Sequence, residues 1–442
     1  MGIQVATDSS RRRVSICVAG TRGDAESLVA LGAGLTAGGF TVTVATHEVF
    51  RPLVEQRGLA FVPLPGDPRA MLSHPALERP ARFGGRDRFT RARLLREVVD
   101  FLLDQIGEED YARACAGADI VVFTPATSVA RRVAEELAIP AVLADYFPAH
   151  RTAAFPHPAL ASGLHFGRLG NLLSYPLAER VLREPFREPL TPGGRREVGL
   201  PARFVPASTA RWPPFPVLLG FSPSLVPRPA DWGPQLHVTG AWLPASSEER
   251  PLSPEVEKFL GAGPPPLYVG FGSMRPLRPE RFARAILGGL ELAGERAIVG
   301  AGWGGLQGAG GSADLLMVDD VPFDLIFPRV KAVVHHGGAG TTHLGLRAGR
   351  PTFVVPFIFD QFFWGSRIAA LEAGPPPLAH THVTPRRVAT ALRALVSRRA
   401  ATAAERLGAA LREEDGPRVA AQRLSALVPL RREEARSGRM RR

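Results

Sequence analysis

Short runs of aliphatic and β-branched residues alternate along the chain with longer segments whose apolar residues recur at helical spacing. The first unit has an apolar run at residues 14–19, a polar glycine turn at 20–24 and a helical segment that ends at the glycine pair 38–39. A further strand is predicted at residues 40–45. Three leucines share one face of the predicted helix: Leu28, Leu31 and Leu35. Because strands that alternate with helices form parallel sheets, the pattern predicts an α/β fold.

The second half of the chain opens in the same way, with the strand and turn LYVGFGS at residues 267–273. Between the halves lies a stretch rich in proline, which is typical of a passage between domains. We therefore predict two doubly wound parallel-sheet domains. The predicted segments are a disordered leader at 1–12, an N-terminal domain at 13–225, an interdomain linker at 226–250, a C-terminal domain at 251–427 and a basic tail at 428–442.

Residues 331–364 carry the most informative pattern, KAVVHHGGAGTTHLGLRAGRPTFVVPFIFDQFFW. A buried strand is predicted at 332–334 and a glycine turn follows it. The next segment is predicted to be a helix, with Thr341 and Thr342 as residues of a type that caps a helix start. The first amides of such a helix have no partner within the helix and lie at the positive end of its dipole. The turn is therefore predicted to receive a phosphate.

Polar residues beside this turn suit a nucleotide sugar. His335 can donate to a pyrophosphate oxygen, and Asp360 with Gln361 offers acceptors and a donor for sugar hydroxyls. The alternative is an ordinary glycine-rich connection without a ligand. The sequence lacks a P-loop and a dinucleotide-binding fingerprint, which excludes those two kinds of phosphate site.

The motifs HHGGAGTT at 335–342 and PFIFDQFFWG at 356–365 resemble the donor-binding motif of family 1 glycosyltransferases, within their sterol and lipid glucosyltransferase branch. Three other motifs are also similar to that family: GTRGD at 20–24, AFPHP at 154–158 and GWGG at 302–305. The resemblance implies the GT-B fold, in which two Rossmann-like domains face each other. It places the acceptor side first and the nucleotide-sugar side second, and in this fold the last helix commonly crosses back to the first domain.

The resemblance also implies roles for individual residues. Asp24 is expected to be the general base or to orient it; the alternative is that Asp24 only caps the first helix. His47 is a rival base, although a hydrogen-bonded loop histidine is the favoured interpretation. The implied donor-binding residues are Thr21, Arg22, Ser273, Trp303, Val321, His335, Gly337, Gly338, Ala339, Gly340, Thr341, Asp360 and Gln361. The implied acceptor-binding residues are Phe147, Phe155 and His157.

The expected activity is an inverting, metal-independent transfer of a hexose, with glucose from UDP-glucose as the first choice, to a hydroxyl of a sterol, a hopanoid or a similar apolar alcohol. One alternative is transfer of a deoxysugar from dTDP or UDP to a polyketide or peptide aglycone. Another is a nucleotide-sugar enzyme that transfers nothing, such as an epimerase, or a nucleotide-binding auxiliary subunit. No cofactor beyond the co-substrate is expected, and no carboxylate pair marks a cation site.

The composition indicates the class of protein and the cellular compartment in which it works. The chain has 442 residues, 45% of them hydrophobic and 22% charged, which suits two globular cores. Its two cysteines, Cys17 and Cys115, cannot form a disulfide framework, so a reducing cytoplasm is expected. No signal peptide or membrane-spanning run is evident.

The net charge of +12 comes almost entirely from arginine. The arginines are scattered and no recognition motif accompanies them, so nucleic acid is not an expected partner. Basic clusters lie at 11–13 and 431–442 and are interpreted as solvated ends, with a peripheral contact to an anionic inner membrane face as the alternative. The apolar helix face at 94–106 is interpreted as core, with a lipophilic acceptor wall or a membrane contact as alternatives.

Overall fold

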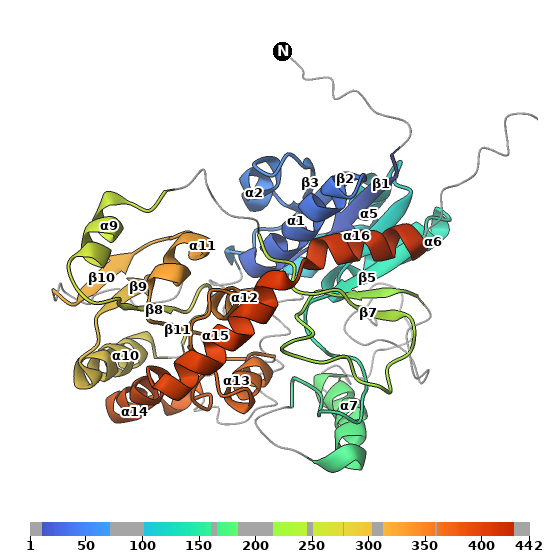
Figure 1. Cartoon of the computed structure of the whole chain (residues 1–442). Coiled ribbons are helices and arrows are strands. Elements are labelled where there is room, and N and C mark those ends of the chain that lie inside the picture. The colour runs from blue at the N-terminus through green and yellow to red at the C-terminus, as the bar shows by residue number, and fades with distance from the viewer. Residues whose placement is uncertain are drawn as a thin grey trace, which may run out of the picture.

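The computed structural model describes residues 11–70, 101–160, 166–183, 215–244, 251–276, 278–302, 313–358 and 360–427. Four sequence predictions therefore lie wholly or largely outside the described residues: the leader up to residue 10, the basic tail from 428, Trp303, and the apolar positions 94–100. The chain forms two α/β domains, which lie side by side (Figure 1).

The first domain contains a seven-stranded parallel sheet. Its strands in spatial order are β3 (Ala60–Leu64), β2 (Thr41–His47), β1 (Arg13–Cys17), β4 (Ile120–Phe123), β5 (Ala141–Asp145), β6 (Val217–Leu219) and β7 (Leu236–Val238). The central strand β4 is apolar and buried along its whole length, because helices cover both faces of the sheet. The helices are α1 (Arg22–Ala37), α2 (Arg51–Glu55), α5 (Glu108–Cys115), α6 (Ser128–Glu136) and α7 (Gly167–Arg183), with single 3-10 turns η1 (Glu48–Phe50) and η4 (Pro125–Thr127).

The boundary predicted between the domains is displaced by the structure. β7 lies inside the segment predicted as a linker, 226–250, yet it pairs in parallel with β6, so the first sheet extends beyond residue 225. A strand of three residues is too short to show a period of two in the sequence. The prolines near it are typical of a linker, so the sequence shows no sign of a strand there.

The second domain contains a five-stranded parallel sheet. Its strands in spatial order are β10 (Leu315–Val318), β9 (Ala297–Gly300), β8 (Leu267–Gly270), β11 (Ala332–His335) and β12 (Thr352–Val354). The helices are α9 (Pro254–Gly261), α10 (Pro279–Ala293), α11 (Phe323–Ile326), α12 (Ala339–Arg347), α13 (Gln361–Ala370), α14 (Pro385–Leu395) and α15 (Arg398–Glu413), with the turns η6 (Phe327–Arg329) and η7 (His380–His382).

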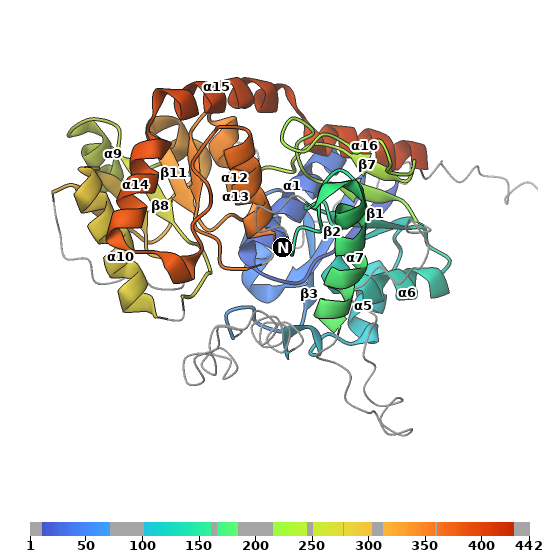
Figure 2. The same cartoon turned by 90° about the horizontal axis from the view of Figure 1, so that it is seen from below.

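The last helix, α16 (Gly416–Leu427), lies against α1 of the first domain, while α15 lies on the second domain (Figure 2). One glycine within α1 and the glycine that caps its C-terminus allow this approach. A Cβ at Gly34 would lie 2.1 Å from Pro417, and one at Gly38 would lie 2.7 Å from Ala421. The C-terminal segment therefore fastens the two domains together at the outer face of α1.

Two further features concern membranes. Among the described residues, no helix combines the length and the apolar character that crossing a bilayer requires. Of the apolar face predicted at 94–106, the described leucines and isoleucine, Leu102, Leu103 and Ile106, are buried, as the interpretation as core requires.

Candidate active site

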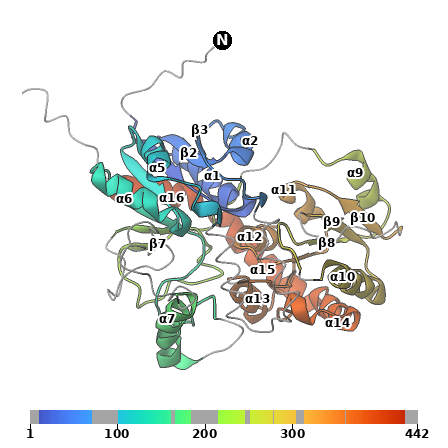
Figure 3. The same ribbon diagram turned by 180° about the vertical axis from the view of Figure 1, so that it is seen from behind.

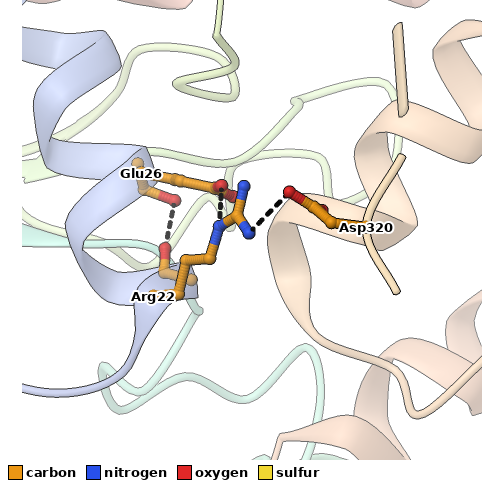
Figure 4. Close-up of polar contacts among 5 residues, drawn as sticks. Arg22, Glu26 and Asp320 are labelled. Atoms are coloured by element: carbon orange, nitrogen blue, oxygen red, sulfur yellow. Dashed lines mark hydrogen bonds and ion pairs between the residues drawn. The ribbon is translucent and has the colours of Figure 1, made fainter. Parts of the chain in front are cut away.

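The turns at the carboxyl ends of the two sheets meet where the domains face each other. Arg22, in the first turn of α1, reaches across to Asp320, which follows β10 in the second domain (Figure 4). Its Nη1 lies 3.3 Å from Asp320 Oδ2, and its Nε donates to Glu26 at 2.7 Å. In parallel sheets, ligands bind at carboxyl edges, and here both edges contribute to one site.

Asp24 is held at the start of α1 by three donors. Its Oδ2 accepts from the backbone N–H of Thr21 at 2.6 Å and from the Thr21 hydroxyl at 2.8 Å. Its Oδ1 accepts from the hydroxyl of Tyr146. The helix-capping role weighed for Asp24 is therefore present in the structure, with Thr21 as the N-cap, and it uses one carboxylate oxygen while the other faces Tyr146.

Tyr146 belongs to a cluster of acidic groups that sequence reasoning missed. Tyr146 follows Asp145 in the chain. Burial raises the pKa of Asp145 to about 7, and the charge of Asp360 makes a smaller contribution to this shift. Burial also raises the pKa of Asp360 to about 7, and the charge of Asp24 adds to this shift. Asp24 and Asp360 come from different domains, so the charge of the expected base in one domain acts on the expected sugar-binding carboxyl of the other.

His47, the rival base, is fully buried and hydrogen-bonded at both ring nitrogens. Its Nδ1 lies 3.0 Å from the carbonyl of Pro65, and its Nε2 accepts from the N–H of Gly20 at 3.3 Å. Burial lowers its pKa, so the neutral ring is favoured. His47 therefore holds the turn that carries Asp24, as the interpretation of a hydrogen-bonded histidine requires.

The glycine turn after β11 has the form that an anion site needs. Gly337 has φ +100°, and a Cβ there would lie 2.6 Å from Val354 and 2.9 Å from the carbonyl of Gln361. The prediction that Thr341 and Thr342 cap the next helix was wrong, because α12 begins at Ala339 with Gly338 as its N-cap. Gly338 has no side chain to occupy the first amides, so these remain available to a ligand.

Space for that ligand lies above the first turn of α12. A Cβ at Gly340 would find no atom within 4 Å, so the helix start is open at this position. Ala339 and Thr341, the other predicted residues of this turn, are half-buried.

The two adjacent histidines at the end of β11 have different surroundings. His335 is fully buried, and its Nδ1 accepts from the N–H of Gly337 at 3.0 Å, while its buried Nε2 has no protein partner. His336 is half-buried: its ring lies 3.4 Å from the Cβ position of Gly272 and 2.6 Å from that of Gly338. Burial lowers the pKa of both, to about 4 for His336.

His336 therefore lies between the glycine turns that follow β8 and β11, and it was not among the predicted residues. The signal for it was present in the sequence, because neighbouring residues at a strand end point to opposite sides. The side chain of His335 is buried in the second domain, and the side chain of His336 lies on the other side, against the glycine turns.

Ser273 and Val321, also predicted to bind the nucleotide sugar, lie at the carboxyl edge of the second sheet. Ser273 is half-buried in the turn after β8, beside Gly272, whose carbonyl lies 2.5 Å from the Cβ position of Gly302. The turns after β8, β9 and β11 are thus in contact. Val321 follows Asp320, and its side chain is buried among the apolar residues of the second domain.

Asp360 and Gln361 stand at the start of α13. Asp360 is the N-cap and its Oδ2 accepts from the indole N–H of Trp364 at 3.1 Å. Gln361 is buried, and its side-chain oxygen accepts from the N–H groups of Phe357 at 2.8 Å and Ile358 at 3.1 Å. The side-chain oxygen of Gln361 is thus used within the protein, and its amide NH₂ group lies 3.3 Å from the sulfur of Met274.

The acceptor residues implied by the AFPHP motif lie in one loop beside α7. Phe155 packs against Phe363 of α13 with ring centroids 5.5 Å apart, so it touches the second domain. The ring of His157 lies 5.2 Å from that of Tyr175, and its Nδ1 accepts from the N–H of Ala159 at 3.2 Å. Phe147 is partly buried next to Tyr146.

The described residues contain no group of three histidine, cysteine, aspartate or glutamate residues that could hold a metal ion. Cys17 and Cys115 are both buried, and neither is in a disulfide.

Comparison with protein families and structures identifies this arrangement. Residues 14–156 match the model of the glycosyltransferase family 28 N-terminal domain. Residues 312–427 match the model of the erythromycin biosynthesis protein CIII-like C-terminal domain. Together these two models cover more than half of the chain.

Curated relatives are sterol 3-beta-glucosyltransferases. One from Arabidopsis thaliana is 33% identical over an alignment of 413 residues that covers 91% of this chain and 64% of the relative. One from Cryptococcus neoformans is 31% identical over an alignment of 433 residues that covers 91% of this chain and 26% of the relative. The chain thus spans less than two thirds of the length of these relatives.

Solved structures share the fold at low sequence identity. The glycosyltransferase of kitacinnamycin superposes with a TM-score of 0.66 at 16% identity, covering 95% of this chain and 100% of that one. The calicheamicin glycosyltransferase CalG4 has a TM-score of 0.62 at 17% identity, covering 94% and 98%. The two parallel-sheet domains and both family matches agree, and this chain belongs to the glycosyltransferases with the GT-B fold that join a family 28 N-terminal domain to an erythromycin CIII-like C-terminal domain.

Proposed function

We propose that this chain transfers a hexose, with glucose from UDP-glucose as the first choice, to a hydroxyl of a sterol or a similar apolar alcohol. The names of the curated relatives support the sterol and the glucose. The observation that carries the proposal is the ion pair of Arg22 with Asp320, 3.3 Å long, which brings the turn of Asp24 against the second domain.

In the proposed reaction the acceptor hydroxyl gives its proton to Asp24 while its oxygen attacks the anomeric carbon. The bond from that carbon to the nucleoside diphosphate breaks in the same displacement, so the configuration inverts. The hydroxyl of Tyr146 and both donor groups of Thr21 fix the orientation of the carboxylate. A fixed base close to the attacking oxygen lowers the barrier by positioning and by proton transfer.

Charge that develops on the leaving diphosphate would be met by the second domain. The open amides at the start of α12 and His336 would supply donors at this point, and the helix dipole would favour the negative charge. Ser273 lies on the same rim. His335 accepts from Gly337 through Nδ1, and its Nε2–H, which has no protein partner, would donate to the diphosphate. Since these donors can offset the charge of the pyrophosphate, the proposed step needs no metal ion. Removal of one such donor typically costs about 10²- to 10³-fold in rate.

A second candidate keeps the reaction type and changes both substrates. The C-terminal family model is that of an erythromycin biosynthesis protein, and a structural neighbour, VinC, was solved in complex with dTDP at 18% identity and a TM-score of 0.60. Transfer of a deoxysugar from dTDP to a natural-product aglycone is therefore the alternative.

A donor screen and an acceptor screen test these proposals. We expect UDP to raise the melting temperature more than dTDP, and we expect mass spectrometry to find a hexosylated sterol after incubation with UDP-glucose. Stabilisation by dTDP alone, with products only from macrolides, would favour the second candidate. Release of UDP with every acceptor unmodified would contradict transfer, and stabilisation by neither nucleotide would contradict the donor site.

A further inference from the structure

One face of α7 is apolar and exposed. Three leucines of α7 lie along it at helical spacing, Leu169 (71% exposed), Leu173 (57%) and Leu177 (54%), and Phe166 (46%) continues the row just before the helix begins. An exposed row of large apolar side chains of this kind often marks an interaction site on a protein surface. We call this set the α7 stripe. A helix on a protein surface normally has polar residues on its outer face, so this stripe is an exception.

The opposite face of α7 packs against the first domain. It contains the buried residues Asn171, Ser174, Tyr175 and Ala178. The inner face thus contains polar as well as apolar residues, and the stripe is a separate, outward face of the helix. Figures 1 and 3 place α7 at the outer end of the first domain, away from both sheets.

We propose that the α7 stripe docks the protein on an anionic lipid surface. The residue types favour lipid over a protein partner, because leucine is under-represented among residues that dominate protein interfaces, whereas leucine and phenylalanine line interfacial helices. The charge also fits. Arg168 is exposed and lies between Phe166 and Leu169 in the sequence, and the whole chain has a net charge of +12.

The inner face of α7 connects the stripe to the acceptor loop. The side-chain amide of Asn171 donates to the carbonyl of Ala153 at 3.0 Å, and the N–H of His157 donates to the hydroxyl of Ser174 at 2.7 Å. The hydroxyl of Tyr175 lies 3.4 Å from the carbonyl of Phe155.

Phe155 in turn packs against Phe363, two residues beyond Gln361. A helix lying on lipid would thus bring the acceptor loop to the membrane. This consequence rests on the proposed lipophilic acceptor, whereas the docking itself does not.

Vesicle sedimentation of the full chain tests docking without any substrate. We expect binding to vesicles of phosphatidylglycerol and phosphatidylcholine in equal parts, and much weaker binding to pure phosphatidylcholine. The double substitution Leu169→Gln with Leu173→Gln should weaken binding to the mixed vesicles at least tenfold. Both leucines are exposed, so the folded structure should tolerate glutamine there.

Leu292→Gln is the control, because Leu292 is also an exposed leucine (51%) and lies on α10 of the other domain. It should leave binding unchanged. Equal binding by the double variant and the wild type would overturn the proposal and assign binding to the basic charge alone. No binding to any vesicle would overturn it as well. A wild-type dimer that becomes monomeric in the double variant would show that a second copy of the chain covers the stripe.

Discussion

Asp145 gives a prediction in which the sign of a pH effect can be worked out. It ends β5 with 3% of its surface exposed, and burial raises its pKa to about 7. An unfolded aspartate has a pKa of about 3.9. The folded protein therefore binds this proton more tightly than the unfolded chain, and between about pH 4 and pH 7 the free energy of unfolding falls as pH rises.

The size of the effect follows from the two pKa values. One pKa unit corresponds to about 1.4 kcal/mol, so the penalty from a charged Asp145 reaches about 4 kcal/mol at pH 8 as an upper value. Asparagine is neutral at every pH and has the same shape. Its amide group can cost about 1–3 kcal/mol if it finds no partner, but that cost does not depend on pH.

Urea unfolding of wild type and Asp145→Asn at pH 5 and pH 8 tests this reasoning. The free energy of unfolding of the variant, relative to wild type, should be higher at pH 8 than at pH 5 by about 2–3 kcal/mol. Glu109→Gln, which removes an exposed carboxylate, is the control for the loss of one negative charge. A difference between Asp145→Asn and wild type that is the same at both pH values would refute the reasoning.

Two further predictions concern the site itself. Tyr146→Phe removes the donor to Asp24 Oδ1, so kcat should fall about tenfold or more, as expected for loss of a hydrogen bond of about 1.5–3 kcal/mol, with KM for the donor unchanged. A change confined to the donor KM would contradict a role at the base. Gly337→Ala should lower the melting temperature and abolish stabilisation by UDP, because its methyl group would meet Val354 at a positive φ. Gly340→Ala adds a methyl group in open space within a helix, so it should be neutral or stabilising by about 1 kcal/mol; destabilisation by both variants would argue against the specific clash.

The sequence predicted those parts of the fold that local patterns determine. Alternating strands and helices gave the two parallel sheets, and the residues after each strand could be assigned to a carboxyl edge because a parallel sheet gathers these edges. The turns of Asp24 and Gly337 were found in this way. The three-residue strand β7 was missed because its pattern is too short, and the start of α12 was placed too late because Gly338 caps it without a side chain.

Contacts that depend on strand order could not be predicted from one sequence. Tyr146 lies 122 positions from Asp24, and it approaches Asp24 because β4 and β5 follow β1 in the sheet. Asp320 lies 298 positions from Arg22 and meets it only because the domains face each other. The acidic cluster and the interdomain ion pair are thus properties of the tertiary structure.

The central claim is that Asp24 accepts the proton of an acceptor hydroxyl while the second domain holds a nucleotide sugar. Measurement of glucosylated sterol formed from UDP-glucose by wild type and Asp24→Asn, together with the UDP-induced rise in melting temperature, tests it most directly. Asparagine retains an oxygen for the donors of Thr21 but cannot act as a base. We predict that product formation falls by a factor of about 10² or more while stabilisation by UDP is retained. Undiminished transfer by Asp24→Asn would contradict the claim and assign the base to another residue.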